Sequence, residues 1–225
     1  MIGKKIVALV PMRHHSQRVP GKNFRLLAGR PLYYHIISSL LLVPRINNVV
    51  VDTDSETIIE GIKEFFPLVT ILKRPDYLRA DTIPMNDILL YDTSQIEADV
   101  YLQTHSTNPL LKVETINRAI DAFLKAFPAR DSLFSVTRLQ TRLWDQVGKA
   151  INHDPSILLQ TQDLPPVFEE NSCLYMFTKK NLEKYQNRLG NNPVMFEMSA
   201  DEAWDIDDEL DFLITEFLMK NKDKV

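Results

Sequence analysis

Basic side chains gather near the start of the chain, directly after a short apolar run at 6–10. Residues 1–51 contain eight Lys and Arg residues and no acidic residue, whereas residues 52–225 contain 18 basic and 30 acidic residues. Half of the eight surround a Pro-Gly-Lys-Asn turn: Arg13, Arg18, Lys22 and Arg25. Cations at the carboxyl end of a parallel strand suit a phosphorylated ligand. Because the positive charge is local, the pattern predicts a site for a small anion rather than for a polymer.

Carboxylates gather at the other end of the chain, where seven acidic residues fall within 201–211. Three of them, Asp207, Asp208 and Glu209, can be explained by the dipole of a predicted closing helix at 209–220. The alternation of Trp204-Asp205-Ile206-Asp207 is also typical of a strand, which would place Asp205 and Asp207 on one side. Two carboxylates on one side can hold Mg²⁺ when phosphate oxygens complete its coordination.

Neither established phosphate-binding fingerprint is present. The chain has no Gly-x-x-x-x-Gly-Lys-Ser/Thr segment, which excludes a P-loop nucleotide-binding site, and no Gly-x-Gly-x-x-Gly segment. Taken by itself, the basic loop fits a solvated surface loop as well as it fits an anion site. Composition therefore leaves the ligand open at this point.

Composition narrows the class of protein. A net charge of −4 argues against a general nucleic-acid binder. A single cysteine, Cys173, excludes an internal disulfide framework and indicates a reducing compartment. The start of the chain does not resemble a signal peptide, and the longest nearly apolar stretch, 36–43, is too short to span a bilayer. We therefore expect a cytoplasmic protein with no membrane partner.

Hydrophobic periodicity predicts alternating strands and helices. Strands are expected at 6–10, 48–51, 69–72, 100–103, 133–136, 173–177 and 194–198, and helices at 31–42, 55–65, 86–97, 113–126, 181–185 and 209–220. This alternation predicts an α/β fold, a doubly wound and mostly parallel sheet with helices on both faces. Residues 138–168 contain three prolines and no long periodic run, which indicates an excursion or hairpin outside the sheet.

The segment 11–23, Pro-Met-Arg-His-His-Ser-Gln-Arg-Val-Pro-Gly-Lys-Asn, resembles the signature loop of the sugar-acid cytidylyltransferases. Acylneuraminate (CMP-sialic acid) synthetases are the nearest group, and CMP-Kdo synthetases are more distant. Further matches follow in the family's order at 27–32, 51–56, Arg74-Pro75 with Asp81-Thr82, Leu102-Gln103 with Pro109-Leu110, 170–175 and 205–207. The resemblance implies one cytidylyltransferase domain over 1–225, with the Rossmann-type fold of nucleotide-diphospho-sugar transferases. It also implies a homodimer, with the excursion as a dimerisation extension.

The resemblance also implies roles for individual residues. Arg13 and Lys22 would hold the phosphates of CTP and, with Asp207, would be catalytic; Asp205 and Asp207 would bind Mg²⁺. The remaining nucleotide-binding residues would be Pro11, Met12, Asn23, Arg74, Asp81 and Gln103. The acceptor site would include Gln103, Glu170 and Asn171. The implied reaction transfers CMP from CTP to a sugar acid such as an N-acylneuraminate and releases pyrophosphate.

The loop departs from the family pattern at two positions. His14 and His15 stand where relatives carry Gly-Gly, so either imidazole could donate a hydrogen bond to phosphate or face solvent. Gln17 stands where relatives carry Lys, and Arg18 follows it as a candidate replacement.

Three alternatives to this function stay open from sequence. The acceptor could be Kdo or another non-sialic compound such as a phosphonate, because the acceptor region departs from the sialic-acid pattern. A glycosyltransferase that consumes a nucleotide sugar also uses Asp-x-Asp, although usually in the middle of its chain. A non-catalytic nucleotide-binding regulator would not need Asp205 and Asp207 together.

Overall fold

The computed structural model describes residues 3–221 and contains a seven-stranded sheet. Its strands, in the spatial order β5-β4-β1-β6-β8-β7-β9, are β5 (Thr70–Lys73), β4 (Ile46–Thr53), β1 (Ile6–Met12), β6 (Val100–Gln103), β8 (Val167–Phe177), β7 (Ser132–Leu139) and β9 (Pro193–Glu197). Within this sheet only β8 runs antiparallel to its neighbours. The predicted, mostly parallel sheet is thus confirmed. A separate two-stranded ribbon pairs β2 (Leu26–Leu27) with β3 (Arg30–Pro31).

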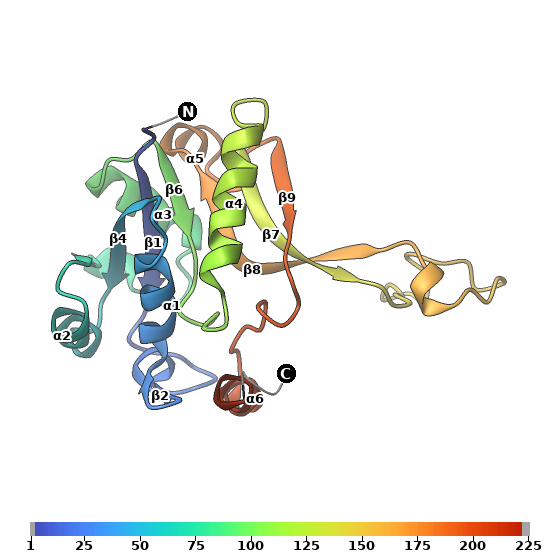
Figure 1. Cartoon of the computed structure of the whole chain (residues 1–225), viewed down its shortest axis with the longest axis horizontal. Helices are drawn as coiled ribbons and strands as arrows, with labels where there is room; N and C mark the ends of the chain where they lie inside the picture. Colours follow the sequence, from blue (N-terminus) through green and yellow to red (C-terminus); the bar gives the residue numbers. More distant parts are fainter. Residues whose placement is uncertain (1–2, 222–225) are drawn as a thin grey trace.

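Helices cover both faces of the sheet, as the sequence predicts (Figure 1). They are α1 (Leu32–Leu41), α2 (Glu56–Phe65), α3 (Met85–Gln95), α4 (Val113–Ala126), α5 (Lys179–Tyr185) and α6 (Glu209–Lys220). The segment after β1 and helix α6 lie at the same end of the sheet, although they come from opposite ends of the chain. No helix within residues 3–221 combines the length and apolar character needed to cross a membrane.

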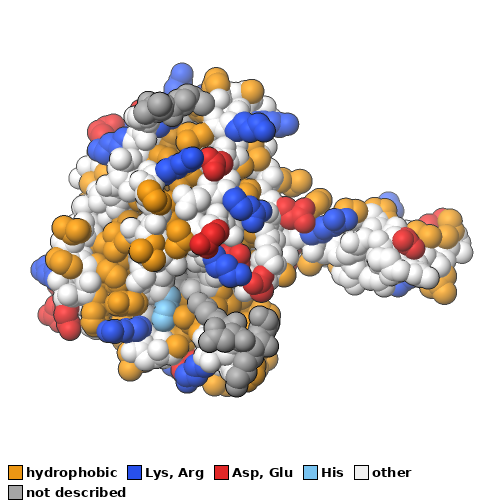
Figure 2. All heavy atoms as spheres, viewed as in Figure 1, with side chains coloured by type: hydrophobic (Ala, Val, Ile, Leu, Met, Phe, Trp, Pro, Cys, Tyr) orange, Lys and Arg blue, Asp and Glu red, His pale blue; other side chains and the backbone are white. Residues whose placement is uncertain are grey.

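An arm projects from the body between β7 and β8 (Figure 1). The two strands continue past the sheet as a ribbon in which Val136 pairs with Glu170 and Leu139 with Val167. Residues 140–166 form the tip, which is irregular apart from a short 3₁₀ turn and an antiparallel bridge between Trp144 and Ala150. The excursion expected at 138–168 is therefore a long hairpin, and its ends are strand residues. Figure 2 shows this arm standing clear of the body, with apolar side chains at its far end.

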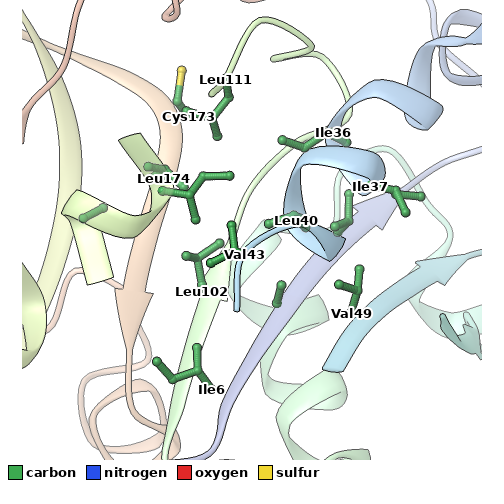
Figure 3. Close-up of a cluster of buried hydrophobic side chains, with 14 of the residues drawn as sticks. Ile6, Ile36, Ile37, Leu40, Val43, Val49, Leu102, Leu111, Cys173 and Leu174 are labelled. Atoms are coloured by element: carbon green, nitrogen blue, oxygen red, sulfur yellow. The ribbon is translucent and has the colours of Figure 1, made fainter. Parts of the chain in front are cut away.

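Alternation along the central strand explains the two-sided core. Ala8 and Val10 of β1 join the larger buried cluster, which includes α1 and α4 residues, whereas Val7 and Leu9 join the cluster on the other face. Figure 3 shows Ile36, Ile37 and Leu40 of α1 among the strand residues of the larger cluster. Burial on both faces gives these central strands their continuous apolar character. A rigid sheet therefore supports the loops at its carboxyl edge.

Candidate active site

A cavity of about 640 Å³ opens at the carboxyl ends of the central parallel strands. Its walls are the loop after β1, the segment after β5, the segment after β6 and the stretch that precedes α6. Nine of the predicted site residues line it: Pro11, Met12, Arg13, Lys22, Asn23, Arg74, Asp81, Asp205 and Asp207. The fold thus brings the basic loop and the acidic cluster together, as their chemistry requires.

The cations of the basic loop are paired with carboxylates that face the same cavity. Arg13 Nη1 donates to Asp81 Oδ1 at 2.5 Å, and Arg18 Nη2 donates to Asp207 Oδ1 at 2.6 Å. These four side chains are roughly half exposed. Exposed ion pairs contribute little to stability, because water screens them. A polyanion can therefore replace the carboxylates around Arg13 and Arg18 at small cost.

Lys22 is held more firmly than the other loop cations. Gly21, with φ +67°, turns the chain into the short 3₁₀ helix η1 (Lys22–Phe24), a conformation that favours glycine. Lys22 Nζ donates to the carbonyl oxygen of Ile206 at 2.5 Å and lies 3.9 Å from Asp207 Oδ1. Burial lowers the pKa of Lys22, and the carboxylates of Asp205 and Asp207 oppose that effect. Lys22 is therefore a positioned ammonium between the two halves of the site.

Asn23 links the loop to the segment that follows β6. Its side-chain amide donates to the carbonyl oxygen of Arg13 at 2.7 Å and accepts from the Ser106 hydroxyl at 2.6 Å. With both amide groups bonded inside the protein, Asn23 holds the shape of the loop.

The two histidines in place of the family's glycines point in different directions. The backbone N–H of His14 donates to Asp54 Oδ1 at 2.7 Å, and its Nδ1 lies 2.7 Å from Ser55 Oγ. His14 therefore anchors the loop to the start of α2. His15 lines the cavity instead. Only the second histidine is thus placed for contact with a ligand.

Asp205 and Asp207 share a side without belonging to a strand, so the expected strand at this point is wrong. Ile206 between them is fully buried, packs with Val19 and Leu27, and donates its N–H to the Thr107 carbonyl at 3.0 Å. This anchor turns both carboxylates toward the cavity. The helix-dipole interpretation of Asp208 fits the structure, because Asp208 caps α6 and forms a capping box with Asp211.

The acidic pair fits a divalent cation. Asp205 Oδ1 is buried and lacks a hydrogen-bond donor, and burial raises the pKa of this carboxyl. A cation beside Asp205 and Asp207 would satisfy that oxygen. Among residues 3–221 no group of three or more His, Cys, Asp or Glu residues is arranged to hold a metal ion. A metal at this pair would therefore take its other ligands from bound phosphates and water.

Three predicted residues do not line the cavity: Gln103, Glu170 and Asn171. Asn171 donates to the Thr137 hydroxyl at 2.8 Å and accepts from the Ser135 hydroxyl at 2.6 Å, which fixes the bulge between β7 and β8. Glu170 accepts from the hydroxyl of Tyr175. Gln103 lies behind the cavity wall and contacts it through Arg188, whose Nη1 donates to Gln103 Oε1 at 2.7 Å.

Sequence reasoning missed several polar residues of the cavity wall, among them Arg188 and His105. Arg188 follows α5 in a segment without any recognisable motif, so no signal in the sequence marks it. His105 lies in the segment after β6, and burial together with nearby Arg188 and Lys22 lowers its pKa to about 3. His105 is consequently neutral at physiological pH.

A buried polar cluster backs the cavity wall at Arg74, whose side chain is 1% exposed. Arg74 forms an ion pair with Asp52 of β4, and Asp92 of α3 contacts Asp52 from the other side. Neither Asp92 oxygen meets an N–H donor. Burial, and then the charge of Asp52, raise the pKa of Asp92 to about 9. Asp92 is therefore protonated at neutral pH and donates to Asp52, because two buried carboxylates in contact cannot both ionise.

This proton makes stability depend on pH. An aspartate in the unfolded chain has a pKa of about 3.9, whereas the pKa of Asp92 in the folded protein is about 9. Unfolding between these values releases a proton, so raising the pH favours unfolding, by at most about 1.4 kcal/mol per pH unit. We expect Asp92→Asn to flatten the decline in unfolding free energy between pH 5 and 8, measured by urea denaturation. Asp87→Asn, an exposed change on the same helix, should leave the decline unchanged. Equal slopes for all three proteins would contradict the assignment.

Comparisons with known proteins identify the family of this chain. A family model described as cytidylyltransferase matches residues 7–223. The CMP-N,N'-diacetyllegionaminic acid synthase of Legionella pneumophila is 29% identical, over 96% of this chain and 97% of its own length. N-acylneuraminate cytidylyltransferase A of Danio rerio is 27% identical, over 95% of this chain and 50% of its own length.

Solved structures show the same fold. CMP:2-keto-3-deoxy-manno-octonic acid synthetase, solved with CTP, matches with a TM-score of 0.74 at 19% identity, covering 97% of this chain and 99% of its own. A 4-diphosphocytidyl-2C-methyl-D-erythritol synthase matches with a TM-score of 0.69 at 17% identity, covering 97% and 100%. With the family model spanning nearly the whole sequence, the chain belongs to the cytidylyltransferase family.

Proposed function

We propose that this protein transfers CMP from CTP to a sugar acid of the nonulosonic class and releases pyrophosphate. The observation that carries the proposal is the cavity in which Arg13, Arg18 and Lys22 face Asp205 and Asp207. Cations on one side suit a triphosphate, and paired carboxylates on the other suit its metal. The family assignment favours this function over a glycosyltransferase or a regulator. We place the reaction in the cytoplasm, consistent with a single, unpaired Cys173.

The reaction follows from the charges around the cavity. The anomeric hydroxyl of the acceptor gives up its proton to water and attacks the α-phosphorus of CTP. Its oxygen forms the new bond to phosphorus, and the bond between the α-phosphorus and the oxygen that bridges to the β-phosphate breaks, so that pyrophosphate leaves with the electron pair. Arg13 and Lys22 stabilise the negative charge that develops on the departing pyrophosphate. Asp205 and Asp207 would hold Mg²⁺, which neutralises phosphate charge and lowers the pKa of the attacking hydroxyl when it is bound.

We infer the identity of the acceptor from the relatives of this chain more than from the shape of the cavity. Two sequence relatives that match nearly the whole chain are named for nonulosonic acids, one for a legionaminic acid and one for N-acylneuraminate. A 3-deoxy-manno-octulosonate cytidylyltransferase of Geotalea daltonii is 25% identical over 62% of this chain, which keeps Kdo as the second candidate. Nothing comparable favours a phosphonate.

The acceptor is tested with a substrate panel. The protein is incubated with Mg²⁺, each of the four nucleoside triphosphates, and N-acetylneuraminate, N,N'-diacetyllegionaminate, Kdo or a phosphonate, and pyrophosphate is measured. We expect release with CTP and a nonulosonic acid, because the loop and acidic pair accept the triphosphate while the acceptor supplies the hydroxyl. Release with Kdo alone would select the second candidate. A lack of release with CTP and every acid would refute the proposed function.

Asp207→Ala tests the metal site. The side chain is about half exposed and bonded only to basic residues of the loop, so its loss should leave the fold intact. We expect Mg²⁺-dependent turnover to fall by about 100-fold or more, as for loss of a principal electrostatic group. Asp201→Ala is the matched control, because Asp201 belongs to the same acidic cluster but bonds to Lys112 outside the cavity. Turnover of Asp207→Ala within a few-fold of the wild type would show that the metal assignment is wrong.

We also propose a homodimer formed through the arm. Several large apolar side chains are exposed at its tip, most of all Val147 at 79% and Leu158 at 92%. Exposed apolar groups gathered on a projecting element are typical of a protein interface. A second copy is the partner that the family resemblance implies, and the arm is long enough to reach beyond its own body.

Charged substitutions at the tip test the dimer. The double variant Val147→Asp/Leu158→Asp should be a monomer, because two carboxylates would be buried in the interface. The molar mass is measured by size-exclusion chromatography with light scattering. Leu68→Asp, at an 89% exposed apolar residue on the body, should remain a dimer. A dimeric double variant, or a monomeric wild type, would refute the proposed interface.

A further inference from the structure

Arg188 is a cation fixed in place by three elements. Its guanidinium lies 3.5 Å from the centre of the Tyr175 ring of β8. Its Nη1 donates to Gln103 Oε1 of β6 at 2.7 Å, and its backbone N–H donates to Asn86 Oδ1 of α3 at 3.3 Å. A guanidinium stacked on a ring and bonded through one nitrogen has lost most of its rotamer freedom. Arg188 lines the cavity, so the guanidinium donors that are not bonded to Gln103 can serve a ligand there.

Arg188 also differs from the other cations of the cavity in its charge balance. Arg13, Arg18, Lys22 and Arg74 each have a carboxylate within 4 Å. Among residues 3–221 no carboxylate lies within that distance of Arg188, and the nearby Glu170 accepts from the Tyr175 hydroxyl instead. Burial lowers the pKa of Arg188, Tyr175 and the charge of Glu170 oppose that effect, and the guanidinium stays charged, as it does in proteins generally. The Arg188 guanidinium is thus a partly buried positive charge that an anionic group of a ligand would neutralise.

The position of Arg188 distinguishes it from the phosphate-binding cations. Arg13, Arg18 and Lys22 belong to the loop after β1 and face the acidic pair. Arg188 contacts Gln103 of β6 and Tyr175 of β8 and lies near His105, which is neutral. A ligand anion at Arg188 would be held from the segment after α5, over β6 and β8, and not by the cations of the loop after β1. The acceptor of the proposed reaction has one such group, its carboxylate.

We infer that Arg188 binds the carboxylate of the sugar acid and thereby selects acidic acceptors. This inference rests on the proposed function. Gln103 and Tyr175 position the guanidinium and do not themselves touch the acceptor carboxylate. The planar guanidinium suits a carboxylate, with which it forms short, charge-assisted hydrogen bonds. Gln103, assigned to the acceptor by resemblance, acts through Arg188 in this arrangement.

The test compares each acid with its own methyl ester. N-acetylneuraminate and Kdo are assayed with CTP, each as the free acid and as the methyl ester, using wild type and Arg188→Met. The methionine keeps the length and apolar contact of the side chain and removes the charge. We expect the KM for the acid to rise about 10- to 100-fold, as for a lost charged hydrogen bond, and the KM for CTP to stay within about two-fold. The preference for acid over ester should largely disappear in Arg188→Met, and Arg188→Lys should restore part of it.

Controls separate the inference from a structural role and from the proposed function. Arg118→Met removes a cation that lies 5.5 Å from the Phe196 ring and does not line the cavity, and it should match the wild type. Calorimetric binding of CTP shows whether Arg188→Met is folded. A raised KM for CTP with an unchanged acid-to-ester preference would overturn the inference in favour of a phosphate or structural role. Wild type that releases no pyrophosphate with any acid would refute the proposed function, and the inference with it.

Discussion

The site depends on the burial of one side chain, Ile206. The two halves of the cavity come from opposite ends of the chain, and the Lys22 ammonium meets the Ile206 carbonyl across a separation of 184 residues. Ile206 packs beside Val19 and Leu27, which belong to the basic loop and the ribbon after it. A fully buried isoleucine contributes on the order of 2 kcal/mol. That contact holds two acidic residues against a cationic loop without any need for regular structure between them.

The cations around the cavity divide into two kinds with different consequences. Arg13 and Arg18 are half exposed and hold carboxylates that water already screens, so their partners can be exchanged for phosphate. Arg74 is fully buried and forms an ion pair with Asp52, and the protonated carboxyl of Asp92 donates to the same aspartate. Removing one member of that cluster would leave a buried charge without a partner. The exposed pairs are therefore suited to ligand exchange, and the buried one to holding the wall in place.

Hydrophobic periodicity predicts the sheet and its helices well, because burial on both faces leaves a strong pattern in β1, β4 and β6. The ordered motifs likewise identify the loop and the acidic pair. Neither periodicity nor motifs predict which neighbour an individual side chain contacts. Nothing in a His-His dipeptide says that His14 bonds to Ser55 while His15 lines the cavity. Asn171 follows the family motif, yet its amide fixes a bulge. Arg188 has no motif at all, because its position depends on how α5 ends above Gln103.

The antiparallel strand β8 contributes both to the cavity wall and to the arm. Its inner half carries Tyr175, the ring beneath Arg188, and its outer half forms the ribbon that leads to the arm. Between these halves lies the bulge that Asn171 bridges to Ser135 and Thr137, with Ser172 at φ +57° beside it. A bulge changes the direction of a strand and fixes where its side chains point. The same few residues therefore set the direction of the arm and the position of the wall on which Arg188 rests. The side of the cavity that carries Arg188 and the proposed dimer contact are thus built on one strand, so the geometry of each constrains the other.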